Sequence, residues 1–234
     1  MMDVRRSDLA ELMDDPTVTL AELEHALGEL EIINKWLGGY RTTRTGIGRL
    51  TQEIPSDATI TVLDVGSGGN DLAAILRPLK KRFEVTALDV NPRMREIAVR
   101  HNHHCRIVTA SAHSLAYPDH SFDIVHASLF LHHCTDFEAI QLLRQAARIA
   151  RLGVVINDLH RHPCALAGIS ALTTLFARSP IVKYDARASV RRAFRRKDLD
   201  SLLGSAGIPG ANISWLWAFR WCIWFAVDER SPHG

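Results

Sequence analysis

Short apolar runs alternate with amphipathic segments through most of the chain. Apolar and β-branched runs predict strands at Ile60–Val65, Phe83–Val90, Arg106–Ala110, Phe122–Ser128 and Leu152–Asp158. Segments with helical spacing lie between these runs, at Asp71–Lys81, Pro92–His101 and Asp136–Ala150. Apolar strands that alternate with amphipathic helices indicate an α/β fold, with a mainly parallel sheet covered by helices on both faces.

The N-terminal part of the chain is predicted to be helical. Leucines and isoleucines at helical spacing follow the capping-box pattern Thr19-x-x-Glu22, and Gly38-Gly39 ends this predicted helix. A second amphipathic stretch covers Arg41–Leu50. Residues 1–54 are therefore expected to form an N-terminal helical lid.

Residues 55–234 are expected to form the main domain. Within them, helices are predicted at 160–178 and Arg196–Ala206, so residues 160–206 are expected to be a helical insertion. The tail is dense in aromatic and β-branched residues, which predicts an antiparallel C-terminal hairpin with its turn near Ala218-Phe219. Together with the five earlier strands, the hairpin makes a seven-stranded sheet.

Composition narrows the class of protein. A chain of 234 residues with 47% hydrophobic residues can bury one substantial core. A formal net charge of +2 provides no strong positive field for nonspecific nucleic-acid binding. The four cysteines lack CxxC spacing, and the N-terminal residues contain no apolar run typical of a signal peptide. We therefore expect a cytoplasmic protein without a transmembrane segment.

The most informative motif is a glycine-rich turn between a predicted strand and a helix. Gly66 and Gly68 follow the strand VLDV, and Asp89 ends the next strand. Glycines allow a sharp turn close to a ligand, and a carboxylate at the second strand end can accept hydrogen bonds from ribose hydroxyls. A dinucleotide fingerprint would need glycine at position 71, which is Asp71. The motif therefore favours a different nucleoside-containing ligand.

Three segments, LDVGSGGN, ALDVN and SLAYPDHSFDIVHASLFLHH, resemble the class I S-adenosylmethionine-dependent methyltransferases, especially the ubiquinone/menaquinone-biosynthesis-like branch. The resemblance covers roughly residues 58 to 160 and implies a Rossmann-like fold with S-adenosylmethionine as cofactor. It places the methionine part at the turn, the ribose at the second strand end and the adenine beyond it. The implied cofactor-binding residues are Asp64, Gly66, Ser67, Gly68, Asp89, Val90, Ser111, Ala112 and Ser128.

The chain departs from that branch at two places. The branch usually has Gly-Asp-Ala before its L-P-F-P-D segment, with the Asp bonded to the adenine amino group, whereas this chain has Ala110-Ser111-Ala112. A weaker hydroxyl or backbone contact must then serve the adenine. Asn70 also replaces the third glycine of the motif.

Histidines follow the fourth and fifth predicted strands, where ligands of open α/β sheets bind. If the methyl acceptor is a phenol or an enol, a base must remove its proton, and imidazole suits this role at neutral pH. The first candidates are His133 and His160, followed by His132 and His162. For each histidine, a helix cap or a bond to a backbone carbonyl is an equally good explanation.

The same histidines and the nearby cysteines raise the question of a metal. Adjacent residues on an extended chain point to opposite faces, so His132 and His133 could not both be ligands without a bend. We therefore expect no metal. The basic run from Arg191 to Lys197 has helix-like spacing and is expected to be a solvated face rather than a nucleic-acid contact.

The expected function is methyl transfer to a small apolar or aromatic acceptor, such as a phenolic or enolic oxygen of a polyketide- or quinone-type molecule. The preference for oxygen rests on a loose similarity of NDLHRHPCALAG and of the N-terminal stretch to bacterial methyltransferases of such products. A nucleic-acid methyltransferase and a noncatalytic Rossmann-like interaction protein remain alternatives. A homodimer is one option for the assembly.

Overall fold

A computed structural model describes residues 6–7, 9–69, 72–101 and 105–227 of the chain. Within these residues, seven strands form one sheet in the order β3-β2-β1-β4-β5-β7-β6. The strands are β1 (Thr59–Val65), β2 (Arg82–Asp89), β3 (Arg106–Thr109), β4 (Phe122–Ser128), β5 (Ala150–Leu159), β6 (Asn212–Leu216) and β7 (Arg220–Ala226). The first five strands are parallel, and β7 is antiparallel to both of its neighbours. The predicted Rossmann-like sheet and its C-terminal hairpin are therefore confirmed.

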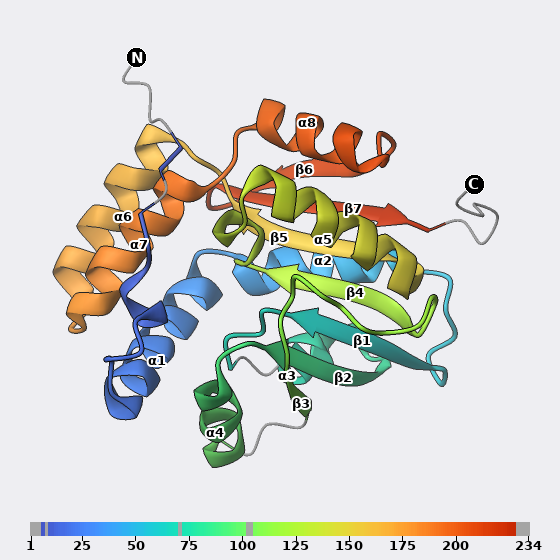
Figure 1. Cartoon of the computed structure of the whole chain (residues 1–234), viewed down its shortest axis with the longest axis horizontal. Helices are drawn as coiled ribbons and strands as arrows, with labels where there is room; N and C mark the ends of the chain where they lie inside the picture. The colour runs from blue at the N-terminus through green and yellow to red at the C-terminus, as the bar shows by residue number, and fades with distance from the viewer. Residues whose placement is uncertain (1–5, 8, 70–71, 102–104, 228–234) are drawn as a thin grey trace.

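The helices cover both faces of this sheet (Figure 1). They are α1 (Leu20–Trp36), α2 (Gly39–Leu50), α3 (Leu72–Leu76), α4 (Pro92–Arg100), α5 (Asp136–Ile149), α6 (Pro163–Phe176), α7 (Pro180–Arg192) and α8 (Arg196–Ala206). Single 3₁₀ turns occur at Leu12–Asp14, Arg77–Leu79 and Leu131–His133. Among the described residues, no helix combines the length and apolarity needed to cross a membrane.

Two apolar cores lie on opposite faces of the sheet. On one face, α5 and α8 pack on the strands through residues such as Leu143 and Leu199. On the other face, Ile47 of α2 and Leu76 of α3 pack against β1 and β5. Because α2 is part of this second core, it packs on the sheet and is not part of the expected N-terminal lid.

Helices α6 and α7 form a pair beside the sheet, next to α1 and the N-terminal segment (Figure 1). The sequence pattern did not predict α7. Ser179 caps α7 and Pro180 begins it, while its buried side chains are small, as at Ala186 and Ala188. Small residues weaken the hydrophobic periodicity, which explains why the helix was missed.

Candidate active site

A cavity of about 1020 Å³ opens at the carboxyl ends of β1, β2, β4 and β5. Its floor includes the glycine turn after β1 and the residues that follow β2 and β4. Its walls come from α1, from α6 and from the N-terminal segment before α1. Segments far apart in the chain therefore meet at the edge of the sheet where α/β proteins bind ligands.

The glycine turn has the geometry of a ligand cradle. Gly66 and Gly68 have φ angles of 65° and 58°, which glycine adopts without strain. The backbone N–H groups of Gly66 and Ser67 donate to the Leu88 carbonyl, at 2.8 and 3.1 Å, and so join the turn to β2. A Cβ atom added to Gly68 would meet nothing within 4 Å, so this backbone faces open space.

Asp89 is held firmly at the edge of the cavity. Its Oδ2 atom accepts a hydrogen bond from the Gly68 N–H at 2.9 Å, and its Oδ1 atom accepts one from the Asn91 N–H at 2.9 Å. Burial raises the pKa of this carboxyl group, although the backbone hydrogen bonds oppose the rise. Asp89 is therefore oriented toward the turn, with lone pairs left for a ligand.

Eight of the nine predicted cofactor-binding residues line the cavity, namely Gly66, Ser67, Gly68, Asp89, Val90, Ser111, Ala112 and Ser128. Asp64 does not line it. The Asp64 carboxylate is buried and lies 2.7 Å from Nδ1 of His126 on the neighbouring strand β4. This geometry favours a structural role for Asp64 rather than the expected contact with the methionine part.

The Asp64–His126 pair begins a buried polar chain beneath the site. Nε2 of His126 lies 3.1 Å from the Thr43 hydroxyl of α2. The Asn157 amide donates to that hydroxyl at 3.1 Å and to the Ser128 hydroxyl at 3.0 Å. The chain links α2, β4 and β5, so it fixes the ends of the strands that carry the site.

The four predicted histidines do not share one environment. His132, His133 and His160 line the cavity, whereas His162 does not. Nδ1 of His162 accepts a hydrogen bond from the Cys164 N–H at 3.1 Å, so this ring caps α6. Nδ1 of His160 accepts a hydrogen bond from Nε1 of Trp215 at 3.2 Å. Neutral His160 therefore carries its proton on Nε2 and is a donor rather than the expected base.

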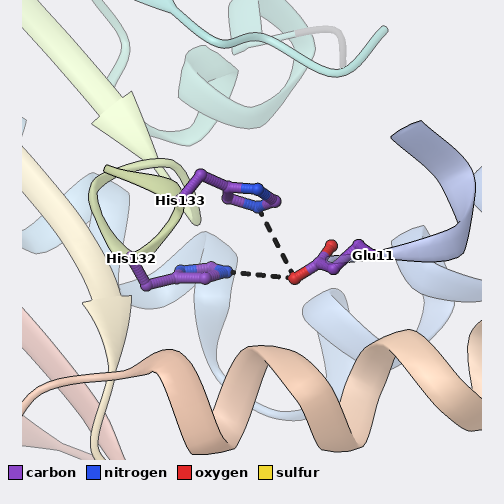
Figure 2. A group of neighbouring side chains, drawn as sticks. All are labelled: Glu11, His132 and His133. Atoms are coloured by element: carbon purple, nitrogen blue, oxygen red, sulfur yellow. Dashed lines mark ion pairs between the residues drawn. The ribbon is translucent and has the colours of Figure 1, made fainter. Parts of the chain in front are cut away.

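His132 and His133 lie side by side, contrary to the expectation for an extended chain. Leu131–His133 form a 3₁₀ turn, and the two imidazole rings have centroids 4.5 Å apart. Figure 2 shows both rings directed toward one carboxylate, that of Glu11. The Glu11 Oε1 atom is 3.5 Å from Nε2 of His132 and 3.6 Å from Nε2 of His133. The sequence predicted that the two rings could meet only if the chain bends here, and the 3₁₀ turn is that bend.

Buried charges surround these two rings. Nδ1 of His132 is 2.7 Å from the buried carboxylate of Asp158 at the end of β5. Burial lowers the pKa of His132, but Asp158 and Glu11 outweigh that effect and raise the pKa to about 9. Burial and the charge on His132 lower the pKa of His133 to about 4. At neutral pH, one ring is therefore charged and its neighbour is neutral.

Arg192 of α7 holds the N-terminal segment against the histidine turn. Its guanidinium donates to the backbone carbonyls of His132, His133 and Leu9, at 3.2, 2.8 and 3.1 Å. The Asp185 carboxylate of the same helix accepts from the backbone N–H of Leu12 at 2.7 Å. These contacts hold Glu11 at the cavity, although about 120 positions of sequence separate it from the histidine turn. No local pattern in the sequence indicated that the two segments meet.

Arg220 is a second residue that the sequence reasoning missed. It begins β7, lines the cavity and is only 3% exposed. Its Nε and Nη1 atoms have no hydrogen-bond partner among the described residues. Burial lowers the pKa of Arg220 to about 10, so the side chain stays charged at neutral pH. A charged residue inside an apolar strand was the signal available in the sequence.

The basic run is largely occupied within the protein. Arg192 bonds backbone carbonyls, as described above, and Arg196 pairs with Asp200 at 2.9 Å on the surface of α8. The expected single solvated helix face is wrong, because α7 ends at Arg192, α8 begins at Arg196, and the two residues after Arg192 are buried. The contacts give no support to a nucleic-acid surface.

Comparisons with known proteins agree with this geometry. Residues 63–156 match the family model of a methyltransferase domain. Demethylmenaquinone methyltransferase of Thermotoga maritima is 29% identical over 90 residues, a match that covers 38% of this chain and only 38% of the relative.

Solved structures extend the likeness over more of the chain. The structure of a plantazolicin methyltransferase with bound S-adenosylhomocysteine (SAH) has a TM-score of 0.64 at 11% identity, covering 90% of this chain and 96% of that chain. Magnesium protoporphyrin IX methyltransferase from Synechocystis, also with SAH, has a TM-score of 0.53 at 16% identity, covering 82% and 84%. At these identities the likeness shows the fold. The chain therefore has the fold of these solved methyltransferases, and its residues 63–156 match a methyltransferase domain.

Proposed function

We propose that this chain transfers the methyl group of S-adenosylmethionine to an oxygen of a small, largely apolar acceptor. The observation that carries the proposal is a cavity of about 1020 Å³, which joins the glycine turn and Asp89 to an apolar wall. A pocket for one drug-sized ligand measures about 300–1,000 Å³. The cavity lies at the upper end of this range, as we expect for a site that holds a cofactor and a small acceptor.

The residues at one end of the cavity fit the cofactor. The open backbone at Gly68 can receive the methionine part, and the Asp89 carboxylate can accept from ribose hydroxyls. Val90 is 69% exposed at the cavity edge, where it can cover one face of the adenine. Ser111 and Ala112 line the same end and are proposed to contact the adenine edge.

The remaining walls suit an apolar or aromatic acceptor. Leu30 and Ile33 of α1 line the cavity together with Ile169 and Leu172 of α6. We propose that α1 and the segment before it form a lid, because these residues close the side of the cavity away from the sheet. An apolar enclosure would exclude water from the transfer, which favours alignment of the two reactants.

Oxygen is favoured as the methylated atom because unpaired donors line the acceptor end. Arg220 presents two N–H groups without a partner among the described residues, and neutral His160 carries a proton on Nε2. Donors of this kind stabilise a phenolate or an enolate better than a neutral amine. The bound cofactor supplies an electrophilic methyl group; the chain's own residues bind the acceptor, orient its oxygen and stabilise the negative charge.

The nucleic-acid alternative has less support, because the basic run makes contacts within the protein. A location in the cytoplasm stays a prediction, consistent with four cysteines that form no disulfide in the structure.

The test is incubation of the purified chain with methyl-labelled cofactor and a panel of phenols, enols, amines and RNA. We expect label in a phenol or an enol, and formation of SAH in equal amount. Label found only in RNA or an amine would contradict the proposed acceptor class. Binding of SAH without transfer to any acceptor, a cell extract included, would favour the noncatalytic alternative.

A further inference from the structure

Glu11, His132 and His133 bring three metal-binding atoms together beside the proposed acceptor site. The Glu11 Oε1 atom and one ring nitrogen of each histidine all lie within 4.8 Å of one another. The two measured carboxylate-to-imidazole distances, 3.5 and 3.6 Å, are nearly equal. Ligands about 2.1 Å from a zinc ion at tetrahedral angles lie about 3.4 Å apart, which is close to both of these carboxylate-to-imidazole distances.

A buried carboxylate orients the His132 ring. Nδ1 of His132 is 2.7 Å from Asp158, whereas Nδ1 of His133 is 3.7 Å from Asp14, beyond hydrogen-bond distance. The Nε2 atoms of both rings point to the Glu11 carboxylate (Figure 2). A carboxylate on the far nitrogen is the usual support of a metal-bound histidine, because it fixes the ring and makes it a stronger ligand.

The Glu11 carboxylate has its own support. The Ser189 hydroxyl of α7 donates to Oε1 at 2.6 Å. Glu11 is 6% exposed although it precedes the first helix, so the N-terminal segment places a charged side chain inside the protein. Burial of a carboxylate is costly unless a positive group compensates for it.

His132 supplies an independent observation that points to a ligand. Its side chain is 2% exposed, and its Nε2 atom has no hydrogen-bond partner among the described residues. The Glu11 carboxylate, its ion-pair partner, lies 3.5 Å away, which is longer than a normal hydrogen bond and close to the separation of two ligands of one ion. A cation between the two atoms would bind both, and its binding would release the proton that His132 carries in the metal-free chain.

We propose that Glu11, His132 and His133 bind one divalent first-row transition metal ion, of which zinc is the reference case. Two imidazoles and one carboxylate form a donor set that suits zinc, iron or cobalt better than magnesium or calcium. All three residues line the cavity, so further coordination positions face the acceptor. Such an open site is typical of catalytic metals rather than structural ones. The proposal replaces the sequence-based expectation of no metal.

The consequence for catalysis rests on the proposed function. A phenolic or enolic hydroxyl bound to the metal would lose its proton to water more readily, because a metal ion lowers the pKa of a bound oxygen acid. The oxygen then forms the new bond to the methyl carbon while the carbon–sulfur bond breaks. The electron pair of the broken bond stays on the sulfur, which gives SAH. The metal thus supplies the activation that His160, as a donor, does not.

Metal binding can be measured without any acceptor. The metal-free full-length chain, without a polyhistidine tag, is titrated with Co²⁺, followed by its visible absorption, and with Zn²⁺ by calorimetry. We expect one ion per chain, with Zn²⁺ displacing Co²⁺. Glu11→Gln and His133→Asn should each weaken binding by more than about tenfold, since each removes one of three ligands. Thermal melting checks that both variants are folded.

Two controls separate this site from other histidines. His25→Asn changes an exposed histidine of α1, and His160→Ala changes a cavity histidine outside the cluster. Both should bind Co²⁺ as the unchanged chain does. Absence of stoichiometric binding, or equal binding by folded Glu11→Gln and His133→Asn, would overturn the proposal. Metal binding without methyl transfer would leave the site intact and contradict the proposed function alone.

Discussion

The Asp89 carboxylate and the Gly68 backbone are joined by a hydrogen bond of 2.9 Å. The bond connects the end of β2 to the turn after β1, so the two segments proposed to hold the cofactor are fixed relative to each other before the cofactor binds. Preorganisation of this kind reduces the entropy lost on binding.

Replacement of Asp89 should weaken cofactor binding. Asp89→Ala removes both the proposed ribose contact and the bond to Gly68, and we expect about a 10- to 100-fold loss, equivalent to about 1.5–3 kcal/mol for a hydrogen bond to a charged group. Calorimetry with SAH measures the change. Glu84→Ala, an exposed change on the same strand, serves as the control. Unchanged affinity in Asp89→Ala would refute the assignment.

Gly66 should not tolerate a side chain. Its φ angle is 65°, and an added Cβ would lie 2.1 Å from Cδ2 of Phe130. Gly66→Ala is therefore expected to lower the free energy of unfolding by about 1–3 kcal/mol through backbone strain, and more if Phe130 cannot move. Urea denaturation gives the value.

Gly28→Ala is the matched change for Gly66→Ala. Gly28 is exposed within α1, and an added Cβ would meet nothing within 4 Å. Alanine in a helix interior should stabilise the protein by about 0.5–1 kcal/mol. Equal effects of the two substitutions would contradict the argument from the close approach of Phe130.

His160 is expected to act as a hydrogen-bond donor to the acceptor. His160→Ala should lower kcat/KM for the acceptor by about tenfold, the equivalent of one lost hydrogen bond of about 1–1.5 kcal/mol. His160→Gln, which keeps an N–H donor, should recover much of the activity, and the affinity for SAH should not change in either variant. If His160→Gln lowers kcat/KM as much as His160→Ala does, His160 acts as a base and not as a donor.

Arg220 is expected to determine affinity for an anionic acceptor oxygen. Arg220→Met should raise the acceptor KM by at least about tenfold, because a hydrogen bond to a charged group contributes about 1.5–3 kcal/mol. Arg220→Lys keeps the charge, so its acceptor KM should lie between those of the unchanged chain and Arg220→Met. Steady-state kinetics with varied acceptor tests this. Arg196→Met, on the exposed surface of α8, should leave KM unchanged.

Asp123 should contribute pH-dependent stability. Burial alone would raise the pKa of Asp123, but hydrogen bonds from Thr61 and Arg151 outweigh it and hold the pKa below its ordinary value of 3.8. Because the folded-state pKa is the lower one, the contribution is present above pH 3.8 and is lost as the pH falls through the folded-state pKa.

The test of Asp123 compares Asp123→Asn with the unchanged chain by urea denaturation between pH 7 and pH 3. The difference in stability should be largest near pH 7 and should shrink on acidification. Asp57→Asn, at an exposed loop position, should show no such trend. A constant difference for Asp123→Asn would rule out the ionised carboxylate as its source.

The sheet was predictable because its signals are local. The strand predicted at Phe122–Ser128 and the helix predicted at Arg196–Ala206 have those bounds in the structure. Each begins or ends where the periodicity of apolar residues changes. The signal of the turn proposed to bind the cofactor was equally local, since Gly66 and Asp89 stand next to strand ends.

The histidine cluster was not predictable in the same way. Glu11 approaches His132 only because Arg192 and Asp185 of α7 hold the N-terminal segment, and α7 itself gave a weak pattern. The role of His160 depends on Trp215, which β6 brings beside it from 55 positions along the chain. Such contacts arise from tertiary packing, which the spacing of residues does not encode.

The position of Glu11 has a practical consequence for anyone who prepares this protein. Glu11 enters the cavity from a segment that precedes every α-helix of the described residues, so a purification handle fused before this segment lies close in sequence to a proposed metal ligand. A hexahistidine handle there would supply imidazoles that compete for the proposed cation. Recombinant chains should carry their handle after β7 instead, or have it removed before any assay.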